Sequence, residues 1–282
     1  MVKCVTRNFV KTIYRKRDEW SHKYDYGHLL VIGGSKQYSG SPAFNALAAL
    51  RAGTDLVTIV APKRAANIIA NFTPDLICYP LNCDYFSLKN LREVLSLLKG
   101  KTAVSIGGGL GRMNKTMTFV RKFLQKTELP TVIDADAIYA VSKHMQIIKE
   151  KKVVLTPHTY EFFVLSGMRV GRNLKKRIKA VESFARKWKV VILLKGHIDI
   201  ISNGEETFIN KTGSPYMTKG GLGDVLTGIV GALLARKVRP IDAAKAAAWI
   251  NGKAGEIAAR KFGEGLLASD VVECIPLAIK FK

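Results

Sequence analysis

The chain has 282 residues, of which 48% are hydrophobic, and carries a formal net charge of +23. This length can bury a sizeable core as one large domain or two small ones. A membrane protein is not expected, because the longest apolar candidate, 225–235, is interrupted by Thr227, Gly228 and Gly231.

The N-terminus has basic residues but no continuous apolar core, so it does not resemble a secretory signal. The closest pair of cysteines has no partner pair or histidine to complete a zinc site. The four cysteines, Cys4, Cys78, Cys83 and Cys274, therefore fit a reducing cytoplasm best. With no linker or internal repeat, we expect a basic extension over 1–26 and a single domain over 27–282.

Short β-branched runs alternate with longer helical patterns such as "SPAFNALAALRAG". Unalternated apolar strands separated by helices predict an α/β fold with a mainly parallel central sheet and helices on both faces. The strand candidates are "HLLVIGG" (28–34), "DLVTIVA" (55–61), "TAVSIGGG" (102–109), "TVIDADA" (131–137), "KVVLTPH" (152–158) and "VVILLKG" (190–196). A hairpin around Asn203-Gly204 and two long helices, about 222–236 and 240–262, complete the prediction.

The high positive charge raises the question of nucleic-acid binding. Its densest cluster, 168–189, has Leu174, Ile178, Val181, Phe184 and Trp188 at helical spacing, so the lysines and arginines fall on the solvated face. No nucleic-acid module signature accompanies the cluster. We therefore expect no specific nucleic-acid binding, and instead attraction of a small anionic substrate.

Unusual residues follow five of the predicted strands. Because ligands of open α/β sheets bind beyond the carboxyl ends of the strands, we expect these residues to line one crevice. The glycine loops "GGSKQYSG" and "GGGLGR" match neither classical phosphate motif, and tight turns explain them as well as a ligand does. The residues are Gly33-Gly34, Gly107 to Gly111, Asp134 and Asp136, His158 and Glu161, and Lys195-Gly196.

The stretch "TKGGLGDVLTG" places Gly220, Gly221, Gly223 and Asp224 at the start of a predicted helix. Free backbone N–H groups and the helix dipole favour an anion there, usually phosphate. Asp224 is then either an N-cap or a general base beside a phosphoryl group. Lys195, at a strand end, is either a surface lysine or a phosphate ligand.

Two pairs of ionisable residues also have open roles. Asp134 and Asp136 could cap a helix, orient a substrate hydroxyl or hold hydrated magnesium. In "TPHTYEF", Pro157 predicts an extended entry, after which His158 and Glu161 fall on one helical face. A functional role is favoured for this second pair over capping or solvation.

Taken together, "KGHIDII", "NKTGSPYMTKGGLGDVLTG" and "LLASDVVECIP" resemble the NAD(P)H-hydrate dehydratases of the ribokinase-like superfamily. The resemblance runs from about Gly27 to Pro276 in family order and implies a ribokinase-like three-layer sandwich. It also implies repair of the S epimer of hydrated NADH or NADPH (NADHX or NADPHX), with ADP or ATP as phosphoryl donor and Mg²⁺ as cofactor. With ADP, the products besides NAD(P)H would be AMP and phosphate.

The resemblance also implies residue roles. Asp224 would deprotonate the 6-hydroxyl of the hydrate, which attacks the terminal phosphoryl group. The hydrate-contacting positions would be Ala43, Gly111, His158 and Asp224. The nucleotide-contacting positions would be Lys195, Gly196, His197, Ile198 and Asp199 with Gly223, and Gly220 and Gly221 complete the glycine turn.

Three departures qualify the resemblance. His158 stands where superfamily kinases often have Asn in Asn-x-x-Glu, which leaves metal placement open, with Glu161 as a ligand through water. Asp199 stands where the family commonly has Thr. No epimerase domain fits in the 26 residues before the domain, so epimerisation would need a separate protein. A small-molecule kinase of the same superfamily is the alternative function, and homo-oligomerisation stays open.

Overall fold

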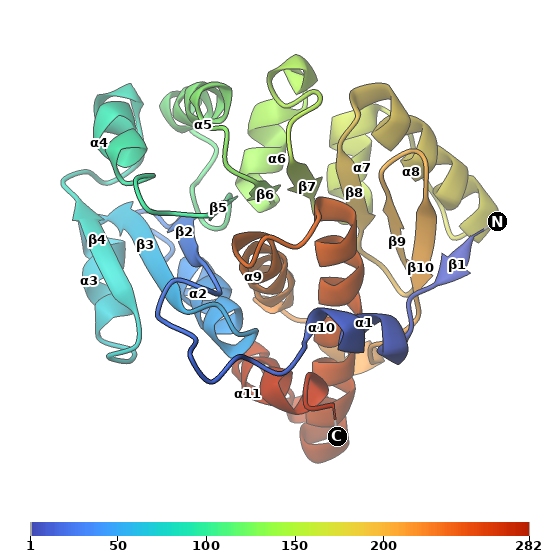
Figure 1. The fold of residues 1–282 in the computed structure, drawn as a ribbon. Helices are drawn as coiled ribbons and strands as arrows, with labels where there is room; N and C mark the ends of the chain where they lie inside the picture. Colours follow the sequence, from blue (N-terminus) through green and yellow to red (C-terminus); the bar gives the residue numbers. More distant parts are fainter. Residues whose placement is uncertain (1, 282) are drawn as a thin grey trace.

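A single mixed sheet forms the centre of the molecule in the computed structural model, which describes residues 2–281 (Figure 1). Its ten strands have the order β1-β10-β9-β8-β7-β6-β5-β2-β3-β4. Among the described strands, only β9 runs antiparallel to its neighbours β8 and β10, so the predicted mainly parallel sheet is confirmed. The strands are β1 (Lys3–Cys4), β2 (His28–Ile32), β3 (Leu56–Pro62), β4 (Ile77–Leu81), β5 (Ala103–Ile106), β6 (Thr131–Ile133), β7 (Val153–Leu155), β8 (Val191–Leu194), β9 (Asp199–Ser202) and β10 (Thr207–Asn210).

Helices cover both faces of the sheet, as the apolar strands predict (Figure 1). Two separate apolar cores result, one under each helical layer. One layer contains α4 (Leu91–Ser96), α5 (Asn114–Lys126), α6 (Ala135–Val141), α7 (Thr159–Ser166) and α8 (Leu174–Trp188). The other contains α1 (Arg7–Ile13), α2 (Gly40–Arg51), α3 (Lys63–Ala70), α9 (Leu222–Ala235), α10 (Pro240–Phe262) and α11 (Ala268–Ala278).

The C-terminal third follows the predicted order of a hairpin and two long helices. β9 and β10 pair around the Asn203-Gly204 turn, with Thr207 opposite Ser202. The most buried helix is α9, in which the last eleven residues all lie in the interior. Its glycines permit close packing on α2, since a Cβ at Gly228 would lie 2.1 Å from the carbonyl oxygen of Asn45. This packing fixes the start of α9 relative to the sheet.

Residues 2–26 lie against the rest of the described chain. β1 extends the sheet in parallel with β10, and α1 packs on α10 with Val10 fully buried. Further along, Arg17 pairs with Asp55 at 3.0 Å and stacks on the ring of Tyr26 at 3.7 Å. The extension thereby contributes an edge strand and a helix to the same structure.

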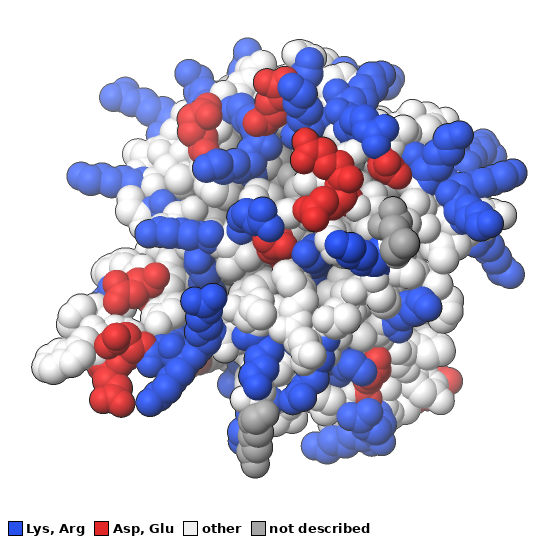
Figure 2. All heavy atoms as spheres, turned by 45° about the vertical axis from the view of Figure 1, so that its right-hand side comes forward, with Lys and Arg blue, Asp and Glu red and all other residues white. Residues whose placement is uncertain are grey.

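The positive charge is spread over the surface. Figure 2 shows Lys and Arg side chains distributed over the visible face, with Asp and Glu side chains among them. In α8, Val181, Phe184 and Ala185 are buried while the lysines lie on the other side, as its helical spacing predicts. No helix within residues 2–281 is long and apolar enough to cross a membrane.

Candidate active site

The predicted crevice residues follow five strands that are neighbours in the sheet, in the order β8, β7, β6, β5 and β2. Because these strands are parallel, their carboxyl ends share one edge. The glycine loops after β2 and β5 touch there, since Gly34 donates from its backbone N–H to the carbonyl of Gly108 at 2.9 Å. The five motifs are therefore brought to one edge of the sheet.

Asp224 lies inside the first turn of α9. The N-cap of this helix is Gly221, whose φ of +90° is in the left-handed region that glycine adopts without strain. The interpretation of Asp224 as an N-cap is therefore wrong. Its Oδ1 instead accepts a hydrogen bond from the Ser41 hydroxyl, in the first turn of α2.

The surroundings of Asp224 raise the pKa of its carboxyl group above the ordinary value. Burial raises the pKa of Asp224 to about 6, and the nearby Asp134 and Asp136 carboxylates act in the same direction. The Ser41 hydrogen bond and the Lys195 ammonium act in the opposite direction and limit the rise. A carboxyl group with this pKa is ionised near neutral pH yet basic enough to accept a proton during a reaction.

Lys195 is a partner of Asp134 and not a surface lysine. Its side chain is 19% exposed, and its Nζ lies 2.9 Å from Asp134 Oδ1. The Asp134 carboxylate also accepts hydrogen bonds from the hydroxyls of Thr156 at 2.8 Å and Thr227 at 2.9 Å. Asp134 occupies the N-cap position of α6 but makes no capping hydrogen bond. Its role here is to hold Lys195.

The ammonium of Lys195 lies next to the start of α9. A Cβ added to Gly223 would be only 3.4 Å from Nζ, and Glu161 Oε2 lies 3.9 Å from Nζ. Burial alone would lower the pKa of Lys195, but the Asp134 and Glu161 carboxylates outweigh it, so that the pKa lies above its ordinary value. The Lys195 ammonium therefore lies beside the first turn of α9, where a helix presents its free N–H groups, and this arrangement suits a phosphoryl group.

His158 and Glu161 form a capping box at the start of α7. His158 Nδ1 accepts from the backbone N–H groups of Tyr160 and Glu161 at 3.1 and 3.3 Å, and Glu161 Oε2 accepts from the His158 N–H at 2.8 Å. Both residues therefore have a structural role, and His158 lies before the helix, not within it. Burial raises the pKa of Glu161, which is 5% exposed.

The predicted Mg²⁺ would have to depend on ligands other than the protein. Within residues 2–281, no three His, Cys, Asp or Glu side chains are grouped so that they could hold a metal ion. Asp134 already accepts three hydrogen bonds, which leaves Glu161, whose Oε2 lies 3.9 Å from Lys195 Nζ, as the carboxylate that could approach a nucleotide-bound ion. This donor set fits a Mg²⁺ ion bound mainly by nucleotide phosphates and water.

The predicted nucleotide segment forms the tight turn between β8 and β9. Asp199 closes it by accepting from the Gly196 N–H and the Asn210 side chain, both at 3.0 Å. Burial raises the pKa of Asp199 to about 6. Gly196 and His197 are exposed on the turn, and Ile198 is half-buried. The side chain at position 199 is therefore part of the turn itself.

The remaining predicted contacts belong to the loop after β5, to α2 and to the segment before α9. Gly111 has a φ of +77° and donates from its N–H to Asp136 Oδ2 at 2.9 Å, and Asp136 Oδ1 accepts from Arg112 Nε at 2.8 Å. Ala43 is buried in α2 at 3% exposure, and Gly220 is exposed before α9. Asp136 thus fixes the loop that carries Gly111.

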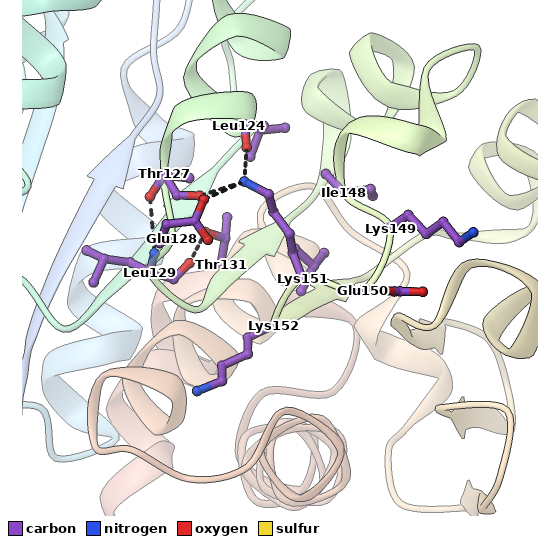
Figure 3. A pocket seen from close by; sticks show the side chains of 11 residues that line it. Leu124, Thr127, Glu128, Leu129, Thr131, Ile148, Lys149, Glu150, Lys151 and Lys152 are labelled. Carbon is purple, nitrogen blue, oxygen red and sulfur yellow. Dashed lines mark hydrogen bonds and ion pairs between the residues drawn. The ribbon is translucent and has the colours of Figure 1, made fainter.

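A cavity of about 340 Å³ lies at the opposite end of the sheet, where β6 and β7 begin (Figure 3). Its central side chain is Lys151, whose ammonium donates to the carbonyls of Leu124 and Thr127 at 3.0 and 2.9 Å. Lys151 also pairs with Glu128 at 3.2 Å. These contacts satisfy the last carbonyls of α5, so Lys151 acts as an anchor for that helix end.

Sequence reasoning did not identify Ser41, Thr156 or Thr227. Ser41 follows the quoted glycine loop "GGSKQYSG" directly, and the other two lie in quoted motifs. A hydroxyl next to a predicted catalytic motif was the available signal. Their partners, however, belong to other strands and helices, and only the fold reveals them.

The sequence of the chain matches a known protein family over most of its length. The family model described as NAD(P)H-hydrate dehydratase matches residues 29–277. The chain belongs to the NAD(P)H-hydrate dehydratase family. The predicted family resemblance is thereby confirmed.

Among curated proteins of this family, the chain is 43% identical over 262 residues to the bifunctional NAD(P)H-hydrate repair enzyme Nnr of Pyrobaculum aerophilum. That match covers 92% of this chain and 52% of the relative, so the chain spans about half the length of this bifunctional relative. It is also 36% identical to the ADP-dependent (S)-NAD(P)H-hydrate dehydratase of Nitrosopumilus maritimus, covering 99% of this chain and 97% of the relative.

A solved structure agrees with this family assignment. It is the ADP/ATP-dependent NAD(P)H-hydrate dehydratase of Bacillus subtilis co-crystallised with ATP and Mg²⁺, with a TM-score of 0.82 at 26% identity. The match covers 98% of this chain and 97% of that structure. The predicted ribokinase-like fold is confirmed by such structural matches.

Proposed function

We propose that the protein dehydrates the S epimer of hydrated NADH or NADPH, using ADP or ATP as phosphoryl donor. The observation that carries the proposal is Asp224, a carboxylate whose pKa is raised to about 6 at a glycine-rich helix start beside Lys195. Family membership and the ADP-dependent relative of nearly equal length support the same reaction.

In the first step, Asp224 takes the proton of the 6-hydroxyl group of the hydrated ring. The hydroxyl oxygen attacks the terminal phosphorus of the nucleotide, and the bond from that phosphorus to the bridging oxygen breaks. With ADP the leaving group is AMP. Phosphoryl transfer of this kind needs positioning and charge stabilisation more than covalent help from the protein.

Charge on the transferring phosphoryl group would be stabilised by the first N–H groups of α9 and by Lys195. Both are preorganised, because Gly221 fixes the helix start and Asp134 holds the ammonium at 2.9 Å. A Mg²⁺ ion bound with the nucleotide would neutralise phosphate charge, and Glu161 is the residue to approach its water shell.

In the second step, the carbon–oxygen bond at C6 of the phosphorylated ring breaks and phosphate leaves. The neighbouring ring carbon loses a proton to water, and the electron pair of that carbon–hydrogen bond forms the ring double bond again. The net change is loss of water from the hydrate and hydrolysis of one phosphoanhydride bond. Because the product is the reduced cofactor, the reaction repairs it.

The nucleotide would lie along Lys195 to Asp199 with Gly220, Gly221 and Gly223, and the hydrate along Ala43, Gly111, His158 and Asp224. We further propose that an NAD(P)H-hydrate epimerase activity supplies the S epimer, since the P. aerophilum relative is a bifunctional repair enzyme about twice the length of the matched segment. The four free cysteines favour a reducing compartment such as the cytoplasm.

A spectrum tests this function. Purified protein mixed with hydrated NADH, ADP or ATP and Mg²⁺ should restore the absorbance of reduced nicotinamide and release phosphate. A stable phosphorylated product without that absorbance would instead show a kinase of the same superfamily. A comparison of ADP with ATP, and of hydrated NADH with hydrated NADPH, in the same assay gives the preferred donor and substrate.

A further inference from the structure

The Asp224 carboxylate is surrounded by groups from four different elements. Asp134 follows β6, Asp136 lies in the first turn of α6, and Lys195 follows β8. The fourth element is α2, which contributes the uncharged Ser41. Of these four residues, Ser41 alone makes a direct hydrogen bond to Asp224.

The contact between Ser41 and Asp224 is built into the fold. Ser41 is part of a helix that packs extensively on α9, so the two backbones are fixed relative to each other. The loop after β5 closes over the pair at Gly108. A Cβ at Gly108 would lie 2.0 Å from Ser41 Oγ and 2.8 Å from Asp224 Oδ1, so only glycine leaves room for both groups.

We propose that Ser41 is a positioning residue for the Asp224 carboxylate. Its hydroxyl donates to Oδ1, which fixes the rotation of the carboxylate and leaves Oδ2 to receive the proton of the attacking hydroxyl. This inference rests on the proposed role of Asp224 as base. No other side chain of the described chain donates a hydrogen bond to Asp224.

Ser41 also favours the charged form of Asp224. Burial raises the pKa of this carboxyl group, whereas a hydroxyl that donates to the carboxylate lowers it. Asp134, Asp136 and Lys195 keep their places when Ser41 is truncated, since none of them is bonded to it. A change in the titration of Asp224 on losing the Ser41 hydroxyl then reports this one hydrogen bond.

The test compares Ser41→Ala with Ser39→Ala. Ser39 is a matched control at the start of the same helix, where its side chain makes no capping hydrogen bond. The first measurement is the dependence of kcat/KM on pH. We expect the acid limb to move up by about one pH unit in Ser41→Ala and to stay in place in Ser39→Ala. At pH 8, where Asp224 is ionised in both proteins, we expect kcat about tenfold lower in Ser41→Ala and an unchanged KM for ADP.

The second measurement does not depend on turnover. Carbon-13 NMR of aspartate carboxyl groups, with Asp224→Asn to assign the signal, follows the titration of Asp224 without substrate. A midpoint about one unit higher in Ser41→Ala supports the proposal. An unchanged midpoint, or an equal rise in Ser39→Ala, would overturn it. Failure of the wild-type protein to restore reduced nicotinamide would instead count against the proposed function, whatever the titration shows.

Discussion

Replacing Asp224 by Asn should abolish turnover and at the same time stabilise the protein. Asn keeps the shape and can still accept from Ser41, but it cannot take a proton. The pKa of Asp224 is raised from 3.8 to about 6 in the folded protein, so the ionised side chain disfavours folding. A rise of about two units corresponds to about 3 kcal/mol at 1.36 kcal/mol per unit.

The sign of this effect depends on pH. As the pH rises through the window from about 4 to about 6, the unfolded chain loses the Asp224 proton first, so the wild-type protein loses stability there. The Asn variant has no such loss. Because water reaches this part-buried carboxylate, we expect a gain nearer 2 kcal/mol at pH 7.5 and almost none at pH 4.

Urea unfolding of both proteins at several pH values measures this difference. Glu205→Gln, which removes an exposed carboxylate on the β9–β10 turn, is the control and should give a difference near zero at every pH. Turnover is followed by the absorbance of reduced nicotinamide, and nucleotide binding by calorimetry. An Asn variant that binds ADP but loses at least about a hundredfold in rate fits a general base. Near-normal turnover, or a stability difference independent of pH, would refute the reasoning.

Three further predictions concern other parts of the molecule. Lys195→Ala should raise the KM for nucleotide at saturating hydrate and lower the free energy of unfolding by about 3 kcal/mol, because the substitution leaves Asp134 buried without its cation. Lys152→Ala, which replaces an exposed lysine, is the control and should change neither value. An unaltered KM in Lys195→Ala would show that Lys195 is not part of the nucleotide site. Gly228→Ala should lower the free energy of unfolding by about 3 kcal/mol despite the higher helix propensity of Ala, because the added Cβ would collide with α2. A variant that unfolds at the same urea concentration as the wild type, or a higher one, would contradict this prediction. Gly40→Ala, also in a helix but with open space around an added Cβ, is the control and should be neutral or slightly stabilising. If the positive charge attracts anionic substrates, added salt should raise the KM values for nucleotide and hydrate and leave the saturated rate unchanged. Fluorescence anisotropy of a labelled oligonucleotide tests the alternative. Tight binding that weakens steeply as salt is added would favour a nucleic-acid role.

Local sequence patterns predicted most of the fold, but not the edge strands β1 and β4. Apolar strands without alternation predicted a parallel sheet covered on both faces, because only such a sheet buries both sides of each strand. The Asn203-Gly204 turn predicted the antiparallel hairpin, since these residues adopt the backbone angles of a tight turn. The shared edge of β2, β5, β6, β7 and β8 also followed from the sequence, because parallel strands carry their loops at the same end.

The contacts inside the site required the structure. Ser41 and Asp224 are 183 positions apart, and Asp134 and Lys195 are 61 apart, so neither pair has a local signal. A local pattern can say that Asp224 starts a helix or that Lys195 ends a strand. It cannot say whether the carboxylate caps the helix or whether the lysine faces solvent, because both depend on which side chain lies opposite. The hydroxyl and the glycine loop opposite Asp224, and the carboxylate opposite Lys195, decide these roles.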